Sequence, residues 1–489
     1  MERKIPRCMS TQHPDNVHIP FFAEDSEMRG EDEIQEAYYA FSHLGCDEQM
    51  WDYEGKEVDN FVIKKLLSTY ESYFHEHFIG RDVFITPRVP NPDIEKSEAK
   101  ILLETLGSIP RSYDAARLFD AGSPPPMIEV ILPMTTSAQQ LNNVYHYYSD
   151  FLVGKQENVF PGSNLTVREW LGEFNPRTIQ VIPLFESVED MLNAPNVLRE
   201  YLKGKHQETQ RVFLARSDPA MNFGLISTVL ANKITLSRLH TLQNELGLSL
   251  HPILGVGSAP FRGGLTPSTA LQVCVENPSV ATFTIQSAFK YDYPPAEVTA
   301  AIKAMKAEPV RAAPPIDEAR ALELMKRLSA AYERQVATLA PMIKRVAAYV
   351  PRRRRRKLHI GVFGYSRNVN GMSLPRAISF TAALYSIGVP PEVLGLNALK
   401  KDDLAFLRAN YLGFESNLRS ACQFADLDSP FFPAEVRAVL PELISLPEPD
   451  PAHLDASRQI CAALGAGNGG SGALETLVLR AAQSRCFLG

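Results

Sequence analysis

Two carboxylates occupy equivalent places in the middle of the chain. Glu186 follows the apolar run at residues 179–184, and Asp218 follows the apolar run at residues 212–214. They lie 32 positions apart (186 to 218), about the length of one strand–helix–strand unit. Parallel neighbouring strands would therefore bring both carboxylates to the same end of a sheet, where α/β enzymes place their active sites.

A carboxylate pair at such a place suits a divalent metal. Mg²⁺ and Mn²⁺ prefer oxygen ligands, and Mg²⁺ commonly takes only one or two carboxylates, which leaves positions for water and a substrate phosphate. Local structure offers a second interpretation, in which Glu186 caps the following helix and Asp218 forms a turn with Pro219.

Two arginines stand where they could bind an anion. Arg88 ends the β-prone stretch DVFIT before a proline-rich loop, and Arg262 lies in a glycine-rich loop, FRGG. A guanidinium offers a planar, bidentate fork to phosphate or carboxylate, and glycines let backbone N–H groups approach an anion. The alternatives are a solvated surface arginine at 88 and a plain turn at 261–264.

His13 precedes Pro14, and a residue before proline is held in extended geometry. Such a histidine can present its ring to a site, or it can be a turn residue beside Asp15. Further polar residues follow predicted strands and are candidates for substrate binding: Arg216, Ser258, Gln286 and Lys290. Lys290 could instead pair with Asp292 at the surface.

The apolar runs define the elements that must position these groups. Seven runs end in polar or glycine-rich loops and begin near residues 83, 128, 179, 212, 248, 281 and 358, and residues 5–9 could supply an eighth. Eight parallel strands separated by helices predict an α/β fold, a closed (β/α)₈ barrel with its catalytic residues at one face. Long helical stretches predict a single domain over residues 1–489 that is mostly α overall, with helical insertions at 31–80 and 297–350 and a helical region at 396–489.

Composition is that of an ordinary globular protein. Net charge is −6, hydrophobic residues make up 45% and charged residues 22%, and the six cysteines form no CxxC pair. We find no apolar run of the ~18 residues that a membrane span needs and no signal-peptide pattern, so we expect a cytoplasmic protein without a membrane partner. The basic run at 352–357 invites a nucleic-acid interpretation, but it lacks interleaved aromatics, and a solvated or oligomer-facing cluster is favoured.

Several motifs resemble one enzyme family in the expected order. IPLFES and ARSDPAMN resemble the metal-binding segments of phosphoenolpyruvate carboxylases, and TQHPDN, EQMWDYEGK and the block at 357–395 resemble its short archaeal-type form. The resemblance implies that His13 is the essential base, that Glu186 and Asp218 bind the metal, and that Arg262, with Arg88, stabilises the transferred groups. Larger members carry a lysine where this chain has Met221, and Arg216 or Lys290 could replace it.

The resemblance also implies an activity and an assembly. Phosphoenolpyruvate and bicarbonate would give oxaloacetate and phosphate through carboxyphosphate and an enolate, with Mg²⁺ or Mn²⁺ as cofactor, in a homotetramer. The alternative enzyme is a Mg²⁺-dependent carbon–carbon lyase acting on pyruvate or oxaloacetate, which would need no bicarbonate. A non-enzymatic alternative is an RNA- or partner-binding protein that uses the arginines at 352–356.

Overall fold

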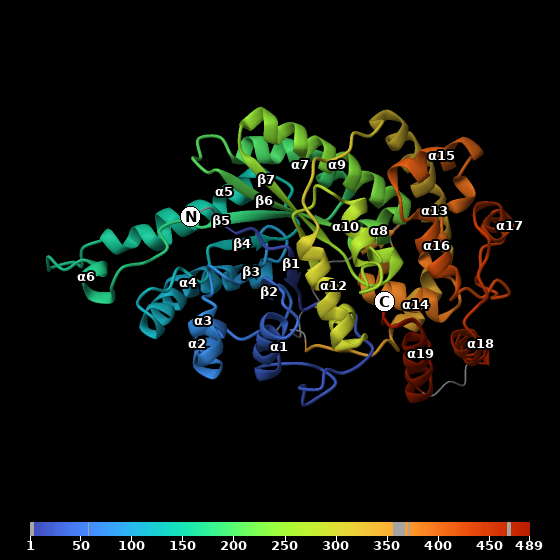
Figure 1. Ribbon diagram of the computed structural model, residues 1–489, viewed down its shortest axis with the longest axis horizontal. Helices are drawn as coiled ribbons and strands as arrows, with labels where there is room; N and C mark the ends of the chain where they lie inside the picture. Colours follow the sequence, from blue (N-terminus) through green and yellow to red (C-terminus); the bar gives the residue numbers. More distant parts are fainter. Residues whose placement is uncertain (1–3, 57, 356–366, 370–371, 467–470) are drawn as a thin grey trace.

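A computed structural model describes residues 4–56, 58–355, 367–369, 372–466 and 471–489. Its centre is a closed barrel of eight parallel strands in sequence order, β1 to β8, with β8 paired to β1 (Figure 1). The expected (β/α)₈ barrel is therefore confirmed. The barrel strands are β1 (Cys8–Ser10), β2 (Glu48–Asp52), β3 (Phe84–Arg88), β4 (Glu129–Leu132), β5 (Gln180–Phe185), β6 (Thr209–Ala215), β7 (Ser249–Gly255) and β8 (Thr282–Ile285).

Helices surround the barrel and make up most of the ordered structure. The barrel region contains α1 (Glu31–Ser42), α2 (Val62–Thr69), α3 (Glu71–Glu76), α4 (Ala99–Phe119), α5 (Ala138–His146), α6 (Val167–Leu171), α7 (Val188–Tyr201), α8 (Ser217–Phe223), α9 (Leu225–Leu246), α10 (Ala270–Glu276) and α11 (Ser287–Tyr291). After β8 come α12 (Pro295–Ala307), α13 (Glu318–Ala347), α14 (Ala377–Ser386), α15 (Lys401–Asn410), α16 (Phe414–Cys422), α17 (Ala434–Leu443), α18 (Pro451–Ala466) and α19 (Ser471–Arg485). Helices from α13 onward gather on one side of the barrel (Figure 1).

The barrel interior explains why these short strands close. Inward-facing apolar side chains form one buried cluster that fills the barrel: Met9, Met50, Ile131, Ile182, Leu184, Phe213, Ala215 and Ile253. Arg211 lies among them and donates to Glu48 at 2.7 Å and to Glu129 at 3.0 Å. A filled interior of this kind leaves the chemistry to the strand ends.

Two sequence predictions about strands need correction. Residues 31–80 were predicted to be helical, but Glu48–Asp52 forms β2, between β1 and β3. Its five residues are all buried, but Glu48, Gln49 and Asp52 make the stretch polar and without regular alternation, which hid the strand. The strand predicted from residue 358 lies outside the described residues, and the eight-stranded barrel closes without it, with β1 as the strand foreseen at residues 5–9.

One segment projects from the body of the molecule. Residues 147–174, which include α6, extend away from the barrel (Figure 1). Phe151 and Trp170 on this arm are 71% and 63% exposed.

Among the described residues, no single helix has both the length and the apolarity to cross a membrane; the bent pair of Ala377–Ser386 and Pro391–Ala398 passes that test only when its two parts are taken together. The cytoplasmic location stays a prediction.

Candidate active site

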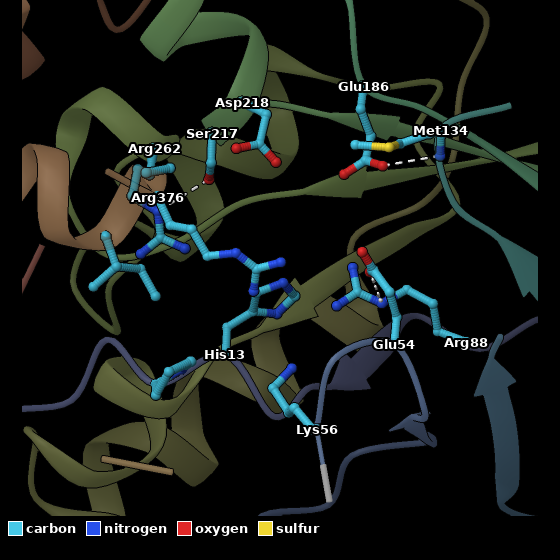
Figure 2. A pocket seen from close by; sticks show the side chains of 13 residues that line it. His13, Glu54, Lys56, Arg88, Met134, Glu186, Ser217, Asp218, Arg262 and Arg376 are labelled. Atoms are coloured by element: carbon cyan, nitrogen blue, oxygen red, sulfur yellow. Dashed lines mark hydrogen bonds and ion pairs between the residues drawn. The ribbon is translucent and has the colours of Figure 1, made fainter. Parts of the chain in front are cut away.

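A polar pocket opens at the carboxyl ends of the barrel strands, and seven of the eight strands contribute to it (Figure 2). His13 follows β1, and Glu54 and Lys56 follow β2. Arg88 ends β3, Met134 follows β4, and Glu186 follows β5. The remaining polar lining is Ser217 and Asp218 after β6, Arg262 after β7, and Arg376 at the start of α14.

The two carboxylates emerge side by side, as their spacing predicts. Strands β5 and β6 are parallel neighbours, with Phe185 opposite Leu214. Glu186 accepts a hydrogen bond from the backbone N–H of Met134 at 2.9 Å. Helix α7 is capped by the next residue, Ser187, so helix capping does not account for Glu186. Asp218 lies in the first turn of α8 and faces the pocket (Figure 2).

His13 lies in the same pocket, opposite the carboxylates (Figure 2). Its Nδ1 is 2.8 Å from the hydroxyl oxygen of Thr11. Burial and the nearby cations Lys56, Arg88 and Arg262 lower the pKa of His13 well below 6.5. The ring is therefore neutral near pH 7, which is the form that can accept a proton.

Arg88 is held by carboxylates that follow or end β2. Its Nε and Nη2 donate to the two oxygens of Asp52 at 2.7 and 2.6 Å, and Nε lies 3.2 Å from Glu54. Lys56 forms an ion pair with the same Asp52 and is largely buried. This side of the pocket thus contains two cations and two carboxylates, packed so that their positions are fixed.

Arg262 is 1% exposed and is fixed by four hydrogen bonds. It donates to Ser217 at 3.0 Å, to Asp15 at 3.1 Å, to Gln286, and to the main-chain oxygen of Gly489 at 2.6 Å. The main chain of Gly489 therefore packs against a residue that lines the pocket. Burial lowers the pKa of Arg262, and Asp15 opposes that effect.

The four residues predicted to bind substrate are absent from the pocket lining that the described residues form. Lys290 donates all three of its N–H groups to protein, to Ser10 Oγ at 2.9 Å, Thr11 O at 3.0 Å and Glu36 Oε1 at 2.8 Å, so none remains for a ligand. It does not pair with Asp292 either, since Asp292 instead accepts from the backbone N–H groups of Val17 and His18.

Ser258 and Gln286 are also engaged elsewhere, and Arg216 is buried away from the lining. Ser258 donates to Leu265 O at 3.1 Å, and Gln286 reaches the site only through Arg262. Arg216 is buried at the start of α8 and lies close enough to Lys233 to lower the pKa of that lysine, after the larger effect of burial.

Sequence reasoning missed other residues of the lining. Glu54 and Lys56 belong to EQMWDYEGK, a motif from which sequence analysis named no site residue. Recognising β2 would have placed both at a strand end. Arg376 belongs to the block at 357–395, from which sequence analysis named no site residue.

These features define the class of protein: a closed parallel barrel whose strand ends gather a carboxylate pair, a neutral histidine and buried arginines is an enzyme barrel. The family model described as "Phosphoenolpyruvate carboxylase" matches residues 5–489. The chain belongs to the phosphoenolpyruvate carboxylase family.

Named relatives cover nearly the whole chain. It is 54% identical over 486 residues to a phosphoenolpyruvate carboxylase of Methanospirillum hungatei, covering 99% of this chain and 100% of the relative. It is 49% identical over 500 residues to that of Halobacterium salinarum, with 99% of each chain covered. Among solved structures, malate synthase of Haloferax volcanii aligns with 12% identity and a TM-score of 0.42, over 86% of this chain and 99% of that one. That likeness is too weak to bear on function.

Proposed function

We propose that this protein carboxylates phosphoenolpyruvate with bicarbonate, giving oxaloacetate and phosphate. The observation that carries the proposal is the meeting of Glu186, Asp218, His13 and Arg262, from four strand ends, in one pocket of a family member. The reaction needs a phosphate-binding cation, stabilisation of an enolate and a base, and these residue types supply them.

Glu186 and Asp218 would hold Mg²⁺ or Mn²⁺. No group of three or more His, Cys, Asp or Glu side chains within the described part of the chain could form an all-protein metal site. A pair of carboxylates fits Mg²⁺ nevertheless, because this ion keeps several positions for water and substrate oxygens. When bound, the metal would neutralise charge on the phosphate and on the enolate oxygen.

The cations of the pocket would bind the anionic substrates. Phosphoenolpyruvate carries a phosphate and a carboxylate, and Arg262 and Arg376 face the pocket near Asp218 while Lys56 faces it beside His13 (Figure 2). Arg262 is fixed by protein partners before substrate arrives. It therefore needs little reorganisation when the phosphoryl group is transferred from phosphoenolpyruvate to bicarbonate. Arg88 has a weaker case, since Asp52 and Glu54 already engage it.

His13 would take the proton of carboxyphosphate, so that carbon dioxide forms beside the enolate. Its depressed pKa keeps it neutral, and its Nδ1 is engaged by Thr11, which directs Nε2 to the substrate. Water must be excluded, because a protonated enolate becomes pyruvate. Pro14, Ala377 and Ile378 contribute apolar surface to the lining.

A coupled assay for oxaloacetate tests the function. Purified protein with phosphoenolpyruvate and Mg²⁺ should form oxaloacetate only when bicarbonate is present. A Mg²⁺-dependent lyase acting on oxaloacetate or pyruvate would form no oxaloacetate from phosphoenolpyruvate and would turn over its own substrate in bicarbonate-free buffer, and that result would replace the proposal.

We further propose that the chain assembles as a homotetramer. Support comes from the arm at residues 147–174, which leaves Phe151, Trp170 and Leu171 exposed and so offers apolar surface to a second copy. Light scattering should give four times the mass of one chain, and Trp170→Asp should lower it. A monomeric mass at micromolar concentration would contradict the proposal.

A further inference from the structure

Two arginines of the basic run lie buried beside the segment that carries His13. Arg353 is 6% and Arg354 2% exposed, so the interpretation of this run as a solvated cluster was wrong for both. Their main chain pairs with Met28: Arg353 O accepts from Met28 N–H at 3.0 Å, and Met28 O accepts from Arg355 N–H at 3.3 Å. The two guanidinium groups are therefore fixed where they stand.

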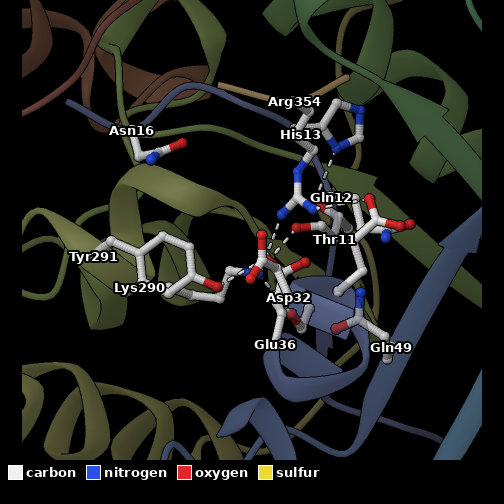
Figure 3. Close-up of polar contacts among 12 residues, drawn as sticks. Thr11, Gln12, His13, Asn16, Asp32, Glu36, Gln49, Lys290, Tyr291 and Arg354 are labelled. Carbon is white, nitrogen blue, oxygen red and sulfur yellow. Dashed lines mark hydrogen bonds and ion pairs between the residues drawn. The ribbon is translucent and has the colours of Figure 1, made fainter. Parts of the chain in front are cut away.

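Arg354 reaches His13 through a chain of contacts (Figure 3). It donates to Glu36, which also accepts from Lys290 and from the hydroxyl of Tyr291, each at 2.8 Å. Lys290 in turn donates to the main-chain oxygen of Thr11. The Thr11 hydroxyl is the group that contacts His13 Nδ1.

Arg353 holds the other side of the same segment. Its Nε donates to Asn16 O at 3.2 Å and its Nη2 to Val17 O at 2.8 Å. Asp15, between His13 and Asn16, is fixed by Arg262 and by the backbone N–H of Ala288. The residues before and after His13 are thus each tied to one of two neighbouring arginines.

We propose that Arg353 and Arg354 are positioning residues for the His13 base. They fix the backbone at residues 10–17 so that the ring enters the pocket with Nδ1 engaged and Nε2 toward the substrate. The inference rests on the proposed function for the chemistry of His13, but the geometric claim stands apart from it. A base displaced by about 1 Å loses on the order of a hundredfold in rate, so fixation of this kind has a measurable effect.

Arg353→Met is the main variant, because it removes the hydrogen bonds to the carbonyls of Asn16 and Val17 without leaving a paired carboxylate behind. Arg353→Lys keeps the charge and a donor and is the conservative rescue. Arg352→Met is the matched control, since Arg352 is exposed one position earlier in the same run. Arg354→Met is the second variant. It removes one of the two cations that pair with the buried Glu36. Its activity is compared with that of the wild type only if its thermal unfolding stays cooperative.

Two readouts separate positioning from a merely structural role. Oxaloacetate formation in Arg353→Met should fall by about tenfold to a hundredfold with the KM for phosphoenolpyruvate within about twofold, and a larger share of turnover should end in pyruvate. The ¹⁵N signals of the His13 ring, assigned by their loss in His13→Asn, should shift in Arg353→Met, recover in Arg353→Lys and stay unchanged in Arg352→Met.

The ring signals also keep the two proposals distinguishable. Wild-type protein that forms no oxaloacetate would overturn the proposed function, while the signals would still report on positioning. His13 signals and a product ratio that are the same in Arg353→Met and wild type, with both proteins folded, would overturn the positioning role.

Discussion

Lys290→Met should destabilise the protein and slow turnover without weakening substrate binding. The lysine side chain is fully buried, and its ammonium group donates to Ser10, Thr11 and Glu36. Methionine keeps a similar length and volume but removes the charge and all three donors. A lysine that bound the substrate directly would give the opposite pattern, a raised KM with unchanged stability.

The loss of unfolding free energy in Lys290→Met depends on which donors remain around Glu36. Removal of one partner of a buried ion pair costs about 3–5 kcal/mol, because the other charge is left buried. Arg354 and Tyr291 still donate to Glu36 in the variant, so we expect the lower end, about 3 kcal/mol. With an unfolding entropy of about 2.1 cal/mol/K per residue, a chain of 489 residues loses about 3 °C in Tm.

Differential scanning fluorimetry and steady-state kinetics on the same preparations check this prediction. Lys56→Met is the matched control, because Lys56 lines the pocket and its partner Asp52 keeps both hydrogen bonds from Arg88. It should raise the KM for an anionic substrate by about tenfold. A Lys290→Met protein with wild-type Tm and a tenfold higher KM would refute the structural role assigned here.

Three further predictions concern the metal, the base and a buried acid. Glu186→Gln should raise the Mg²⁺ concentration for half-maximal activity at least about tenfold, as removal of one charged ligand implies, and an unchanged Mg²⁺ titration would contradict the metal assignment. His13→Asn should keep phosphoenolpyruvate binding and lose oxaloacetate formation, with phosphate release as the residual activity; retained carboxylation would remove His13 from the mechanism. Burial raises the pKa of Glu392 from 4.5 to about 7, so its ionisation costs stability as pH rises from about 4.5 to 7. Between pH 4.5 and pH 8, the free energy of chemical unfolding should therefore fall by about 3 kcal/mol less in Glu392→Gln than in the wild type. The same pH dependence in both proteins would exclude this effect.

The sequence predicted the barrel because most of its strands are apolar runs with polar residues directly after them. Glu186 and Asp218 follow two such runs, and their adjacency follows from parallel pairing of neighbouring strands. Strand β2 was not predicted, because its inward Glu48 and its Asp52 make the stretch look polar. Both charges are satisfied by arginines distant in sequence, Arg211 and Arg88, which no local pattern reveals.

The binding residues were harder to predict for the same reason. The side chain of a polar residue after a strand can point into the pocket or back into the protein. Its direction depends on which hydrogen-bond or ion-pair partner lies nearby in the fold. Lys290 turns toward Glu36, 254 positions away, whereas Lys56 turns into the pocket. Arg353 and Arg354 likewise depend on contacts with residues more than 300 positions earlier, so their charge run alone suggested a solvated surface.

The central claim is that this pocket transfers phosphate from phosphoenolpyruvate to bicarbonate and then joins the resulting carbon dioxide to the enolate. Mass spectrometry of the products formed from ¹⁸O-labelled bicarbonate tests it most directly. The mechanism predicts one labelled oxygen in inorganic phosphate and two in the new carboxylate of oxaloacetate, because the phosphorus keeps the bicarbonate oxygen that attacked it. Phosphate without label, formed at the rate of oxaloacetate, would contradict it.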